Sequence, residues 1–235
     1  MSVSGRAAMR NWAAVCGVCL VLTGCSTMVD GRAVPADTDG PKPVPKSAFT
    51  HALLDTGEIS DIMGASAMTV KTTLDELHEE KDFPDTTCTA AWMPVENSAY
   101  ADSGWTSLRG QVLADDTDAP TDHYVIQALV GFKSHTEAQD FFEKTAKDWT
   151  SCGDQTFTNH HHSDNTDTRW DFGETTNEDS TLTVTQSQQN TPGWGCQRAM
   201  RVSNNVAIDV IACKMHADDE GTAIIDQIDA RLPSV

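Results

Sequence analysis

The clearest hydrophobic pattern in the chain predicts a helix over residues 134–152. Ser134-His135-Thr136-Glu137 has the form of a capping box, in which the serine hydroxyl accepts the amide hydrogen three residues on and the glutamate reaches back. Apolar side chains then recur at helical spacing and define one buried stripe. The stripe contains Ala138, Phe141, Phe142, Thr145 and Trp149, with Cys152 one turn further on and Gly153 at the end.

Two long segments, 105–113 and 123–132, are rich in residues that favour β-strands. The second is apolar on both faces, which predicts a central strand. Shorter strands are predicted at 67–72, 88–92, 156–158, 168–172 and 181–188, with loops at 78–85, 114–121 and 159–165. Helical segments are predicted at 47–54, 58–63, 94–100 and 218–232, the first two broken at Gly57.

Asn204-Asn205 lies between two apolar strands and predicts a two-residue hairpin turn of type I′, because asparagine tolerates positive φ. In that register the numbers of paired residues add up to 409, so Cys196 faces Cys213. The pair falls at a non-hydrogen-bonded position, where Cα atoms approach to about 4.5 Å, within the range of a disulfide. The hairpin also directs Val206 and its alternate neighbours to one face and Ile211 to the other.

The amino-terminal residues have the pattern of a lipoprotein signal peptide. Arg6 and Arg10 precede an apolar run, 12–22, that suits a signal peptide and is too short to span a bilayer. Leu22-Thr23-Gly24-Cys25 resembles the bacterial lipobox. That resemblance implies cleavage before Cys25 and a lipid on its thiol, with residues 1–24 removed. The alternative is an ordinary secretory signal with a chance cysteine.

Residues 25–46 are polar and rich in proline and glycine, which predicts an extended tether of up to ~60 Å. The remaining residues, 47–235, are enough for one domain with its own core. The segment 1–24 contains two of the seven cysteines, and the lipid takes Cys25. Four cysteines remain, and in an oxidising compartment they predict two disulfides. If Cys196 pairs with Cys213, then Cys88 pairs with Cys152 by elimination.

The formal charge is −19, and loss of Arg6 and Arg10 with the signal leaves 14 basic and 35 acidic residues, near −21. This acidity argues against nucleic acid and against electrostatic docking on anionic lipid. Solubility of an exported protein explains it, and attraction of a cationic ligand is the alternative.

Recognised chemical motifs are absent from the sequence. There is no G-x-S-x-G, H-E-x-x-H or S-x-x-K, and no closely spaced cysteine pair of the kind that holds zinc. His160-His161-His162, near Asp164 and Asp167, is interpreted as a solvated polar loop, with weak zinc or copper binding as the alternative. We therefore expect no catalytic residues, no metal and no cofactor.

Several segments form a recognisable set: Tyr100-Ala-Asp-Ser-Gly-Trp105 with Arg109-Gly-Gln111, the helix ending in Trp-Thr-Ser-Cys152, Gly195-Cys-Gln-Arg198, and the Asn-Asn hairpin with Cys213. Together they are similar to the extracellular sensor domain of the PknH-type mycobacterial receptor kinases. The similarity covers nearly all of residues 47–235. It implies an α+β domain with a twisted, mostly antiparallel sheet, helices packed on it, two disulfides and a large cleft. The same domain occurs in free-standing lipoproteins, which this chain resembles because it has a lipobox and no kinase.

The leading hypothesis is a lipid-anchored, extracytoplasmic binding module for an unidentified small molecule or cell-envelope ligand. Tyr100, Trp105 and Arg109 are the candidate ligand-binding residues, since two aromatics and a cation suit a sugar or a phosphorylated or carboxylated ligand. The structural alternatives are a core role for Trp105 and an ion pair for Arg109. The second hypothesis is an interaction partner of a receptor kinase or an envelope enzyme, and the third is a hydrolase with an unrecognised site.

Overall fold

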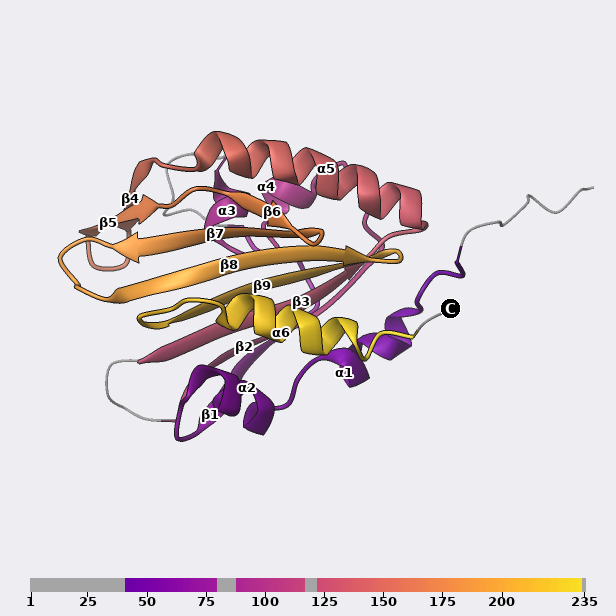
Figure 1. Ribbon diagram of the computed structural model, residues 1–235, viewed down its shortest axis with the longest axis horizontal. Helices are drawn as coiled ribbons and strands as arrows, with labels where there is room; N and C mark the ends of the chain where they lie inside the picture. Colours follow the sequence, from indigo (N-terminus) through magenta and orange to yellow (C-terminus); the bar gives the residue numbers. More distant parts are fainter. Residues whose placement is uncertain (1–40, 80–87, 117–121, 234–235) are drawn as a thin grey trace, which may run out of the picture. The chain divides into compact units, whose positions relative to one another are not determined.

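The computed structural model describes residues 41–79, 88–116 and 122–233. Within these ranges nine strands form one antiparallel sheet with helices on both faces, so the fold is α+β as predicted (Figure 1). The strand order is β1-β2-β3-β9-β8-β7-β5-β4, and β6 pairs with β7 beside this path. The elements are η1 (Lys46–Ala48), α1 (Phe49–Ala52), α2 (Thr56–Met63), β1 (Met68–Leu74), α3 (Thr89–Trp92), α4 (Asn97–Tyr100), β2 (Ser107–Asp115), β3 (His123–Gly131), α5 (His135–Cys152), β4 (Thr156–His161), β5 (Thr166–Phe172), β6 (Thr176–Glu178), β7 (Thr181–Gln188), β8 (Trp194–Ser203), β9 (Val206–Met215) and α6 (Glu220–Asp229).

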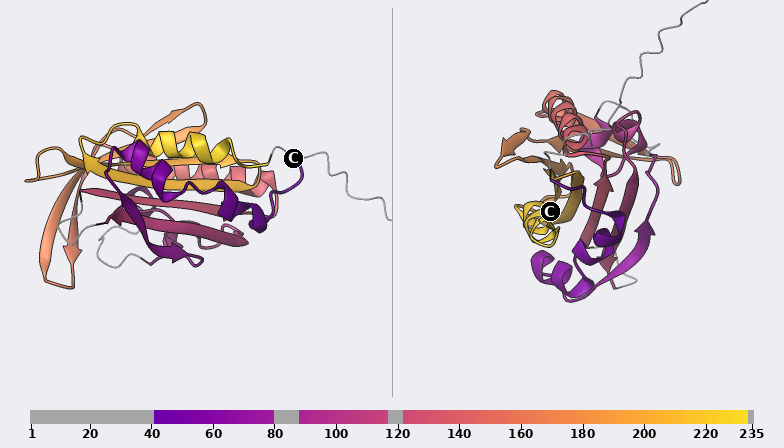
Figure 2. Two further views of the ribbon diagram at one scale, coloured as in Figure 1. Left: turned by 90° about the horizontal axis from the view of Figure 1, so that it is seen from below. Right: turned by 90° about the vertical axis from the view of Figure 1, so that its right-hand side faces the viewer.

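Each face of the sheet has its own apolar core, because the central strands are buried on both sides. The α5 face packs against α3, α4 and α5, and the α6 face packs against α1, α2 and α6. Alternation along β9 divides its side chains as predicted, with Ile208 on the α6 face and Ile211 on the α5 face. Figure 2 shows the β4–β5 hairpin turned away from the direction of the long strands, and Trp170 of this hairpin packs on the α5 face.

The β8–β9 hairpin has the predicted register from Trp194 opposite Met215 to Ser203 opposite Val206. Cys196 and Cys213 are directly opposite and form a disulfide with a Cα–Cα distance of 3.9 Å. The turn type differs from the prediction, since Asn204 has φ 52° but Asn205 is not in the positive-φ region. A two-residue turn of either primed type gives the same register, so the predicted cysteine pairing is unaffected.

Helix α5 begins and ends where its pattern predicts, and the Ser134 side chain accepts a hydrogen bond from the Glu137 amide. The glutamate carboxylate reaches back one residue further than expected, to the Lys133 amide at 3.0 Å. The predicted second disulfide joins Cys152, the last residue of α5, to Cys88 with a Cα–Cα distance of 5.7 Å. This bond ties the end of the helix to the start of α3.

Two predictions for the amino-terminal half of the domain were wrong. Residues 88–92 form the short helix α3 rather than a strand, with a hydrogen bond from the Met93 amide to the Thr89 carbonyl. Gly57 lies inside α2 rather than between two helices, because Asp55 and Glu58 form a capping box that starts the helix before the glycine.

The predicted polar loop at 159–165 is shorter in the structure, since β4 continues to His161 and β5 begins at Thr166. Cross-strand polar pairs extend the ladder, as between His160 Nδ1 and Asp167 Oδ1 at 2.5 Å. Strand β6 was not predicted, because its three residues are exposed and carry no apolar alternation. It forms a hairpin with β7 through Asp179 and Ser180, both at positive φ.

The predicted lipidation site, Cys25, the segment 1–24 and the tether up to residue 40 lie outside the described residues, as do most of the loops predicted at 78–85 and 114–121. Among the helices of the described ranges, none has the length and apolar character needed to cross a membrane.

Candidate ligand-binding clefts

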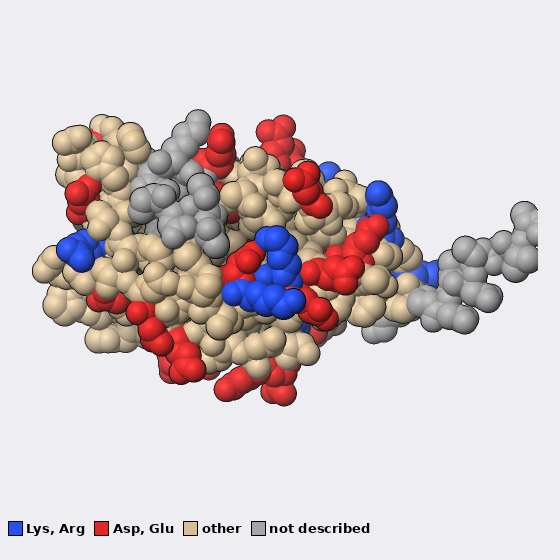
Figure 3. All heavy atoms as spheres, turned by 90° about the horizontal axis from the view of Figure 1, so that it is seen from above, with Lys and Arg blue, Asp and Glu red and all other residues tan. Residues whose placement is uncertain are grey.

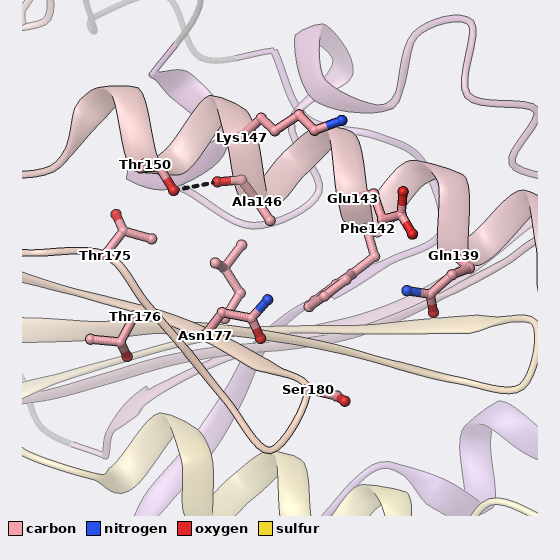
Figure 4. Close-up of a pocket in the computed structure, with 11 residues that line it drawn as sticks. Gln139, Phe142, Glu143, Ala146, Lys147, Thr150, Thr175, Thr176, Asn177 and Ser180 are labelled. Atoms are coloured by element: carbon pink, nitrogen blue, oxygen red, sulfur yellow. Dashed lines mark hydrogen bonds between the residues drawn. The ribbon is translucent and has the colours of Figure 1, made fainter.

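A cleft of about 690 Å³ lies between α5 and the β6–β7 hairpin, and is called the α5 cleft below. Figure 4 shows Gln139 and the Phe142 ring projecting from the helix toward the strands, while Asn177 projects from β6 toward the helix. The cleft exists because α5 crosses the sheet and β6 leaves the main path of strands at this point. Its lining residues are Gln139, Phe142, Glu143, Ala146, Lys147, Thr150, Thr175, Thr176, Asn177, Ser180 and Leu182.

The floor of the α5 cleft is apolar and its rim is polar. Phe142 and Leu182 belong to the core on the α5 face and are at most 5 % exposed. The hydroxyls of Thr150 and Thr175 donate to carbonyls of α5, at 2.8 and 2.9 Å, so their oxygens keep acceptor capacity. The side chains of Gln139, Asn177 and Ser180 make no hydrogen bond within the described part of the chain.

Charge in the α5 cleft is balanced, since Glu143 and Lys147 lie one helical turn apart on the same helix. Neither side chain has an ion-pair partner among the residues that the structure describes. The surface seen from above in Figure 3 carries acidic groups around a small basic patch, consistent with the four carboxylates and two lysines of α5. The cleft therefore presents both donors and acceptors with no surplus of positive charge.

A second cleft, of about 680 Å³, lies on the other side of the β6–β7 hairpin and is called the α6 cleft. Arg201 of β8 lies within it, 2.8 Å from Asp226 Oδ1 and 3.4 Å from Asp229 Oδ2. The same guanidinium donates to the Thr181 hydroxyl through Nε at 2.8 Å and Nη2 at 2.6 Å. Its cationic side chain is therefore already engaged. The other lining residues are Thr176, Glu178, Asp179, Ser180, Thr183, Gln197, Val202 and Thr222.

A buried charged network lies beneath the α5 face. Asp209 of β9 is fully buried, and its Oδ2 accepts hydrogen bonds from the Tyr100 hydroxyl and the Val95 amide, both at 2.9 Å. Its Oδ1 forms an ion pair with Arg198 Nη2 at 2.7 Å. Burial, together with the neighbouring Asp209 carboxylate, raises the pKa of Tyr100 well above its usual value. The tyrosine is therefore a neutral donor at physiological pH.

Arg198 carries the matching charge of this network and is 1 % exposed. Its guanidinium also donates to four backbone carbonyls, two in the central strands and two in the segment around α3. Its Cζ lies 4.7 Å from the centre of the Trp149 ring, so it also makes a cation–π contact with α5. One buried pair thus connects α3, α4 and α5 to the middle of the sheet.

The three predicted ligand-binding residues do not come together. Tyr100 is 1 % exposed, bonded to Asp209 and stacked on Phe141 at 4.4 Å. Trp105 is half-buried against the same core. Arg109 faces the opposite side of the sheet, because its cross-strand neighbour Leu129 belongs to the core on the α6 face. Neither cleft is lined by any of the three.

The histidine segment lies on the β4–β5 hairpin. His160 pairs with Asp167 across the strands, and its ring centre is 4.9 Å from that of His162. His161 bonds the Thr168 hydroxyl at 3.1 Å. Within the described ranges, no group of three or more histidine, cysteine, aspartate or glutamate side chains is arranged to hold a metal ion.

The cleft residues themselves were missed by sequence reasoning. The polar side of the predicted helix, at Gln139 and Glu143, and the run of polar residues 174–180 were visible in the sequence. Polar helix faces and polar loops are common on any surface, so neither pattern indicates a cleft by itself.

Together these features define a disulfide-braced α+β domain with an antiparallel sheet covered on both faces and clefts along one hairpin. A family model described as the PknH-like extracellular domain matches residues 44–231. The chain belongs to this family.

Relatives and a solved structure agree with this assignment. The serine/threonine-protein kinase PknH of Mycobacterium bovis is 30 % identical over 212 residues, covering 89 % of this chain and 34 % of the kinase. PknH of Mycobacterium tuberculosis is 30 % identical over 197 residues, covering 83 % of this chain and 31 % of the kinase. The chain thus spans about a third of the length of these relatives.

The crystal structure of the extracellular domain of PknH from Mycobacterium tuberculosis superposes with a TM-score of 0.77 at 28 % identity, covering 82 % of this chain and 98 % of that chain. The matched region is an extracellular domain and not a kinase catalytic domain. The chain is accordingly an extracytoplasmic, sensor-like domain.

Proposed function

We propose that this protein is a lipid-anchored sensor-like domain that binds an unidentified small molecule or cell-envelope ligand in the α5 cleft. The observation that carries the proposal is the composition of that cleft. An apolar floor at Phe142 and Leu182 is surrounded by polar side chains. Among them, Gln139, Asn177 and Ser180 make no side-chain hydrogen bond in the described part of the chain. A concave site with an apolar base and a few unengaged polar groups is the usual form of a small-molecule site.

The proposed role is binding rather than catalysis. Of the buried carboxylates, Asp209 is paired with Arg198 and lies away from both clefts, so it does not form an acid–base pair with a second carboxylate there. The family resemblance supports the same role, since the matched domain is the extracellular part of a receptor kinase.

The proposal is tested by native mass spectrometry of the full chain purified from its own envelope in mild detergent. We expect a co-purifying mass that is retained in the control Asn97→Ala and lost in Gln139→Ala and Asn177→Ala. Asn97 is the matched control because it is an exposed asparagine on α4 that lines neither cleft. A ligand retained by both cleft variants would refute the α5 cleft as its site.

The sequence-based choice of Tyr100, Trp105 and Arg109 stays a prediction, and the same experiment tests it. Trp105→Ala and Arg109→Ala are suitable variants, because both side chains are only partly buried. Loss of the ligand in these variants, with retention in Asn177→Ala, would favour the earlier choice of residues over the α5 cleft.

The proposed lipid anchor rests on the lipobox at 22–25. Replacing Cys25 by alanine should move the protein from the membrane fraction to the soluble fraction and leave its melting temperature unchanged. A variant that stays with the membrane after a salt wash would show that another element anchors the chain.

Partnership with a receptor kinase or an envelope enzyme is the alternative. A large apolar patch on a flat face would favour it. In the ranges that the structure describes, the large apolar side chains that are exposed are Val70 and Met215, at 38 % and 44 %. Ligand binding in the cleft therefore has the stronger support.

A further inference from the structure

The two clefts are parts of one continuous surface. Thr176 and Ser180, in the β6–β7 hairpin, line both the α5 cleft and the α6 cleft. Each cleft has a volume near 700 Å³, large enough for a small ligand by itself. A ligand longer than one cleft would therefore lie across the hairpin and contact α5 at one end and the α6 side at the other.

The groups along this path are hydroxyls and amides rather than charges of one sign. Gln139, Asn177 and Ser180 offer both donors and acceptors with no partner in the described part of the chain, and Thr222 continues the hydroxyl lining on the α6 side. The apolar floor at Phe142 supplies a surface for aliphatic C–H groups. This combination matches a polyhydroxylated ring, which has hydroxyls at its edge and C–H groups on its faces.

The charges argue against an anionic ligand. Lys147 faces the α5 cleft together with Glu143, so the two charges balance. Arg201 is the cation of the α6 cleft and is held by Asp226, Asp229 and a threonine hydroxyl.

The hairpin between the clefts adds two more carboxylates, Glu178 and Asp179. They have no ion-pair partner among the described residues. A phosphate or carboxylate that lay across the hairpin would be repelled by these two carboxylates. The cation that lines the α6 cleft is already engaged and would not be available to pair with it.

We propose that the ligand is a neutral oligosaccharide that lies across the β6–β7 hairpin and occupies both clefts. This inference rests on the proposed function and adds the class of ligand and its extent. One end lies over Phe142 and bonds Asn177 and Gln139, and the other end reaches Thr222 beside α6. Phosphorylated or carboxylated sugars of the same length bind more weakly.

The test is calorimetric titration of the full chain, in a detergent without a sugar head group, at about 0.15 M salt. The probes are linear neutral gluco-, manno-, galacto- and arabino-oligosaccharides of two to six units, each matched by a form with a terminal phosphate or carboxylate. We expect affinity for one neutral series to rise about tenfold or more with length, since added units reach the second cleft. The anionic form should bind less tightly at each length.

Three variants separate the two ends of the site. Asn177→Ala should weaken all lengths by about tenfold, the scale of one or two lost hydrogen bonds. Thr222→Ala should weaken only the longest oligosaccharides, and the control Asn97→Ala should leave every affinity unchanged. Melting temperatures of the unliganded variants show whether each one is folded.

Three results overturn the inference. An anionic series that binds more tightly than its neutral counterpart contradicts the ligand class, and affinity independent of length contradicts the span across the hairpin. Absence of binding by every oligosaccharide contradicts the inference as a whole. None of these results refutes the proposed function, because the co-purification experiment with Gln139→Ala and Asn177→Ala decides that question separately.

Discussion

Replacing Asp209 by asparagine should destabilise this domain more than almost any other isosteric change. One carboxylate oxygen accepts hydrogen bonds from the Tyr100 hydroxyl and the Val95 amide, and the other forms an ion pair with the Arg198 guanidinium, itself a donor group. An amide of similar volume has one acceptor oxygen and one NH₂ donor, so at least one of the three donors would face another donor. The substitution also removes the negative charge that compensates the buried guanidinium.

The size of the effect follows from the burial of both partners. Asp209 and Arg198 are 0 % and 1 % exposed, so water does not reach the charge left behind. Breaking such a pair by removing one partner costs about 3–5 kcal/mol. The four backbone carbonyls and the Trp149 ring around Arg198 hold the cation in place, so it cannot turn toward solvent without losing those contacts. For a domain of this size the loss corresponds to a melting temperature lower by roughly 10 °C.

The assay is urea unfolding of the wild type, Asp209→Asn, Arg198→Met and the double variant, with disulfides intact and two spectroscopic probes. Coincident transitions would justify a two-state free energy of unfolding. The double variant should lose less than the sum of the single losses, by about 1–3 kcal/mol, because the two side chains interact directly. A free energy of unfolding for Asp209→Asn within about 0.5 kcal/mol of the wild type, or strict additivity, would refute the reasoning.

Three further outcomes test other parts of the fold. Phe141→Ala should cost about 3–5 kcal/mol in urea unfolding, because the ring is 4 % exposed between two aromatic rings at 4.4 and 5.3 Å; an unchanged midpoint would contradict its place in the core. Joint replacement of Cys88 and Cys152 by alanine should cost about 4 kcal/mol in urea unfolding without reductant, and stability equal to that of the oxidised wild type would contradict this. Hydrogen bonds from a backbone amide and from Lys214, 3.1 Å away, outweigh the effect of burial and lower the pKa of Glu220. Its contribution is therefore present above its unfolded pKa of about 4.3 and is lost as pH falls through the folded pKa. The wild type should lose stability below about pH 5 more steeply than Glu220→Gln, and parallel pH profiles would contradict this.

Some elements of this protein were determined by local sequence patterns. The capping residue Ser134 and the stripe through Phe141 placed α5 correctly, because both signals act within a few turns of one helix. The Asn204-Asn205 turn predicted the register of ten residue pairs and, with it, the disulfide between Cys196 and Cys213. A two-residue turn leaves only one way to pair the strands beside it, so the pairing follows from local geometry.

Other elements depended on contacts between distant residues. Residues 88–92 have strand-like composition but form a helix, and their carbonyls accept bonds from Gln186 and Arg198, about a hundred positions away. The hydroxyl of Tyr100, whose role as a ligand-binding residue stays a prediction, donates to Asp209, 109 positions away. Neither partner is visible in the local pattern, and tertiary contacts override weak local preferences.

The clefts were decided by tertiary structure alone. Their walls come from α5, the β6–β7 hairpin and the α6 side, which are separated in the sequence and meet only because strand order places β6 beside the main sheet. The sequence by itself determined helix α5, the β8–β9 hairpin, the two disulfides and the family. The position and polarity of the clefts depend on how those elements pack, because a concave surface is a property of several segments at once and leaves no periodic signal in any one of them.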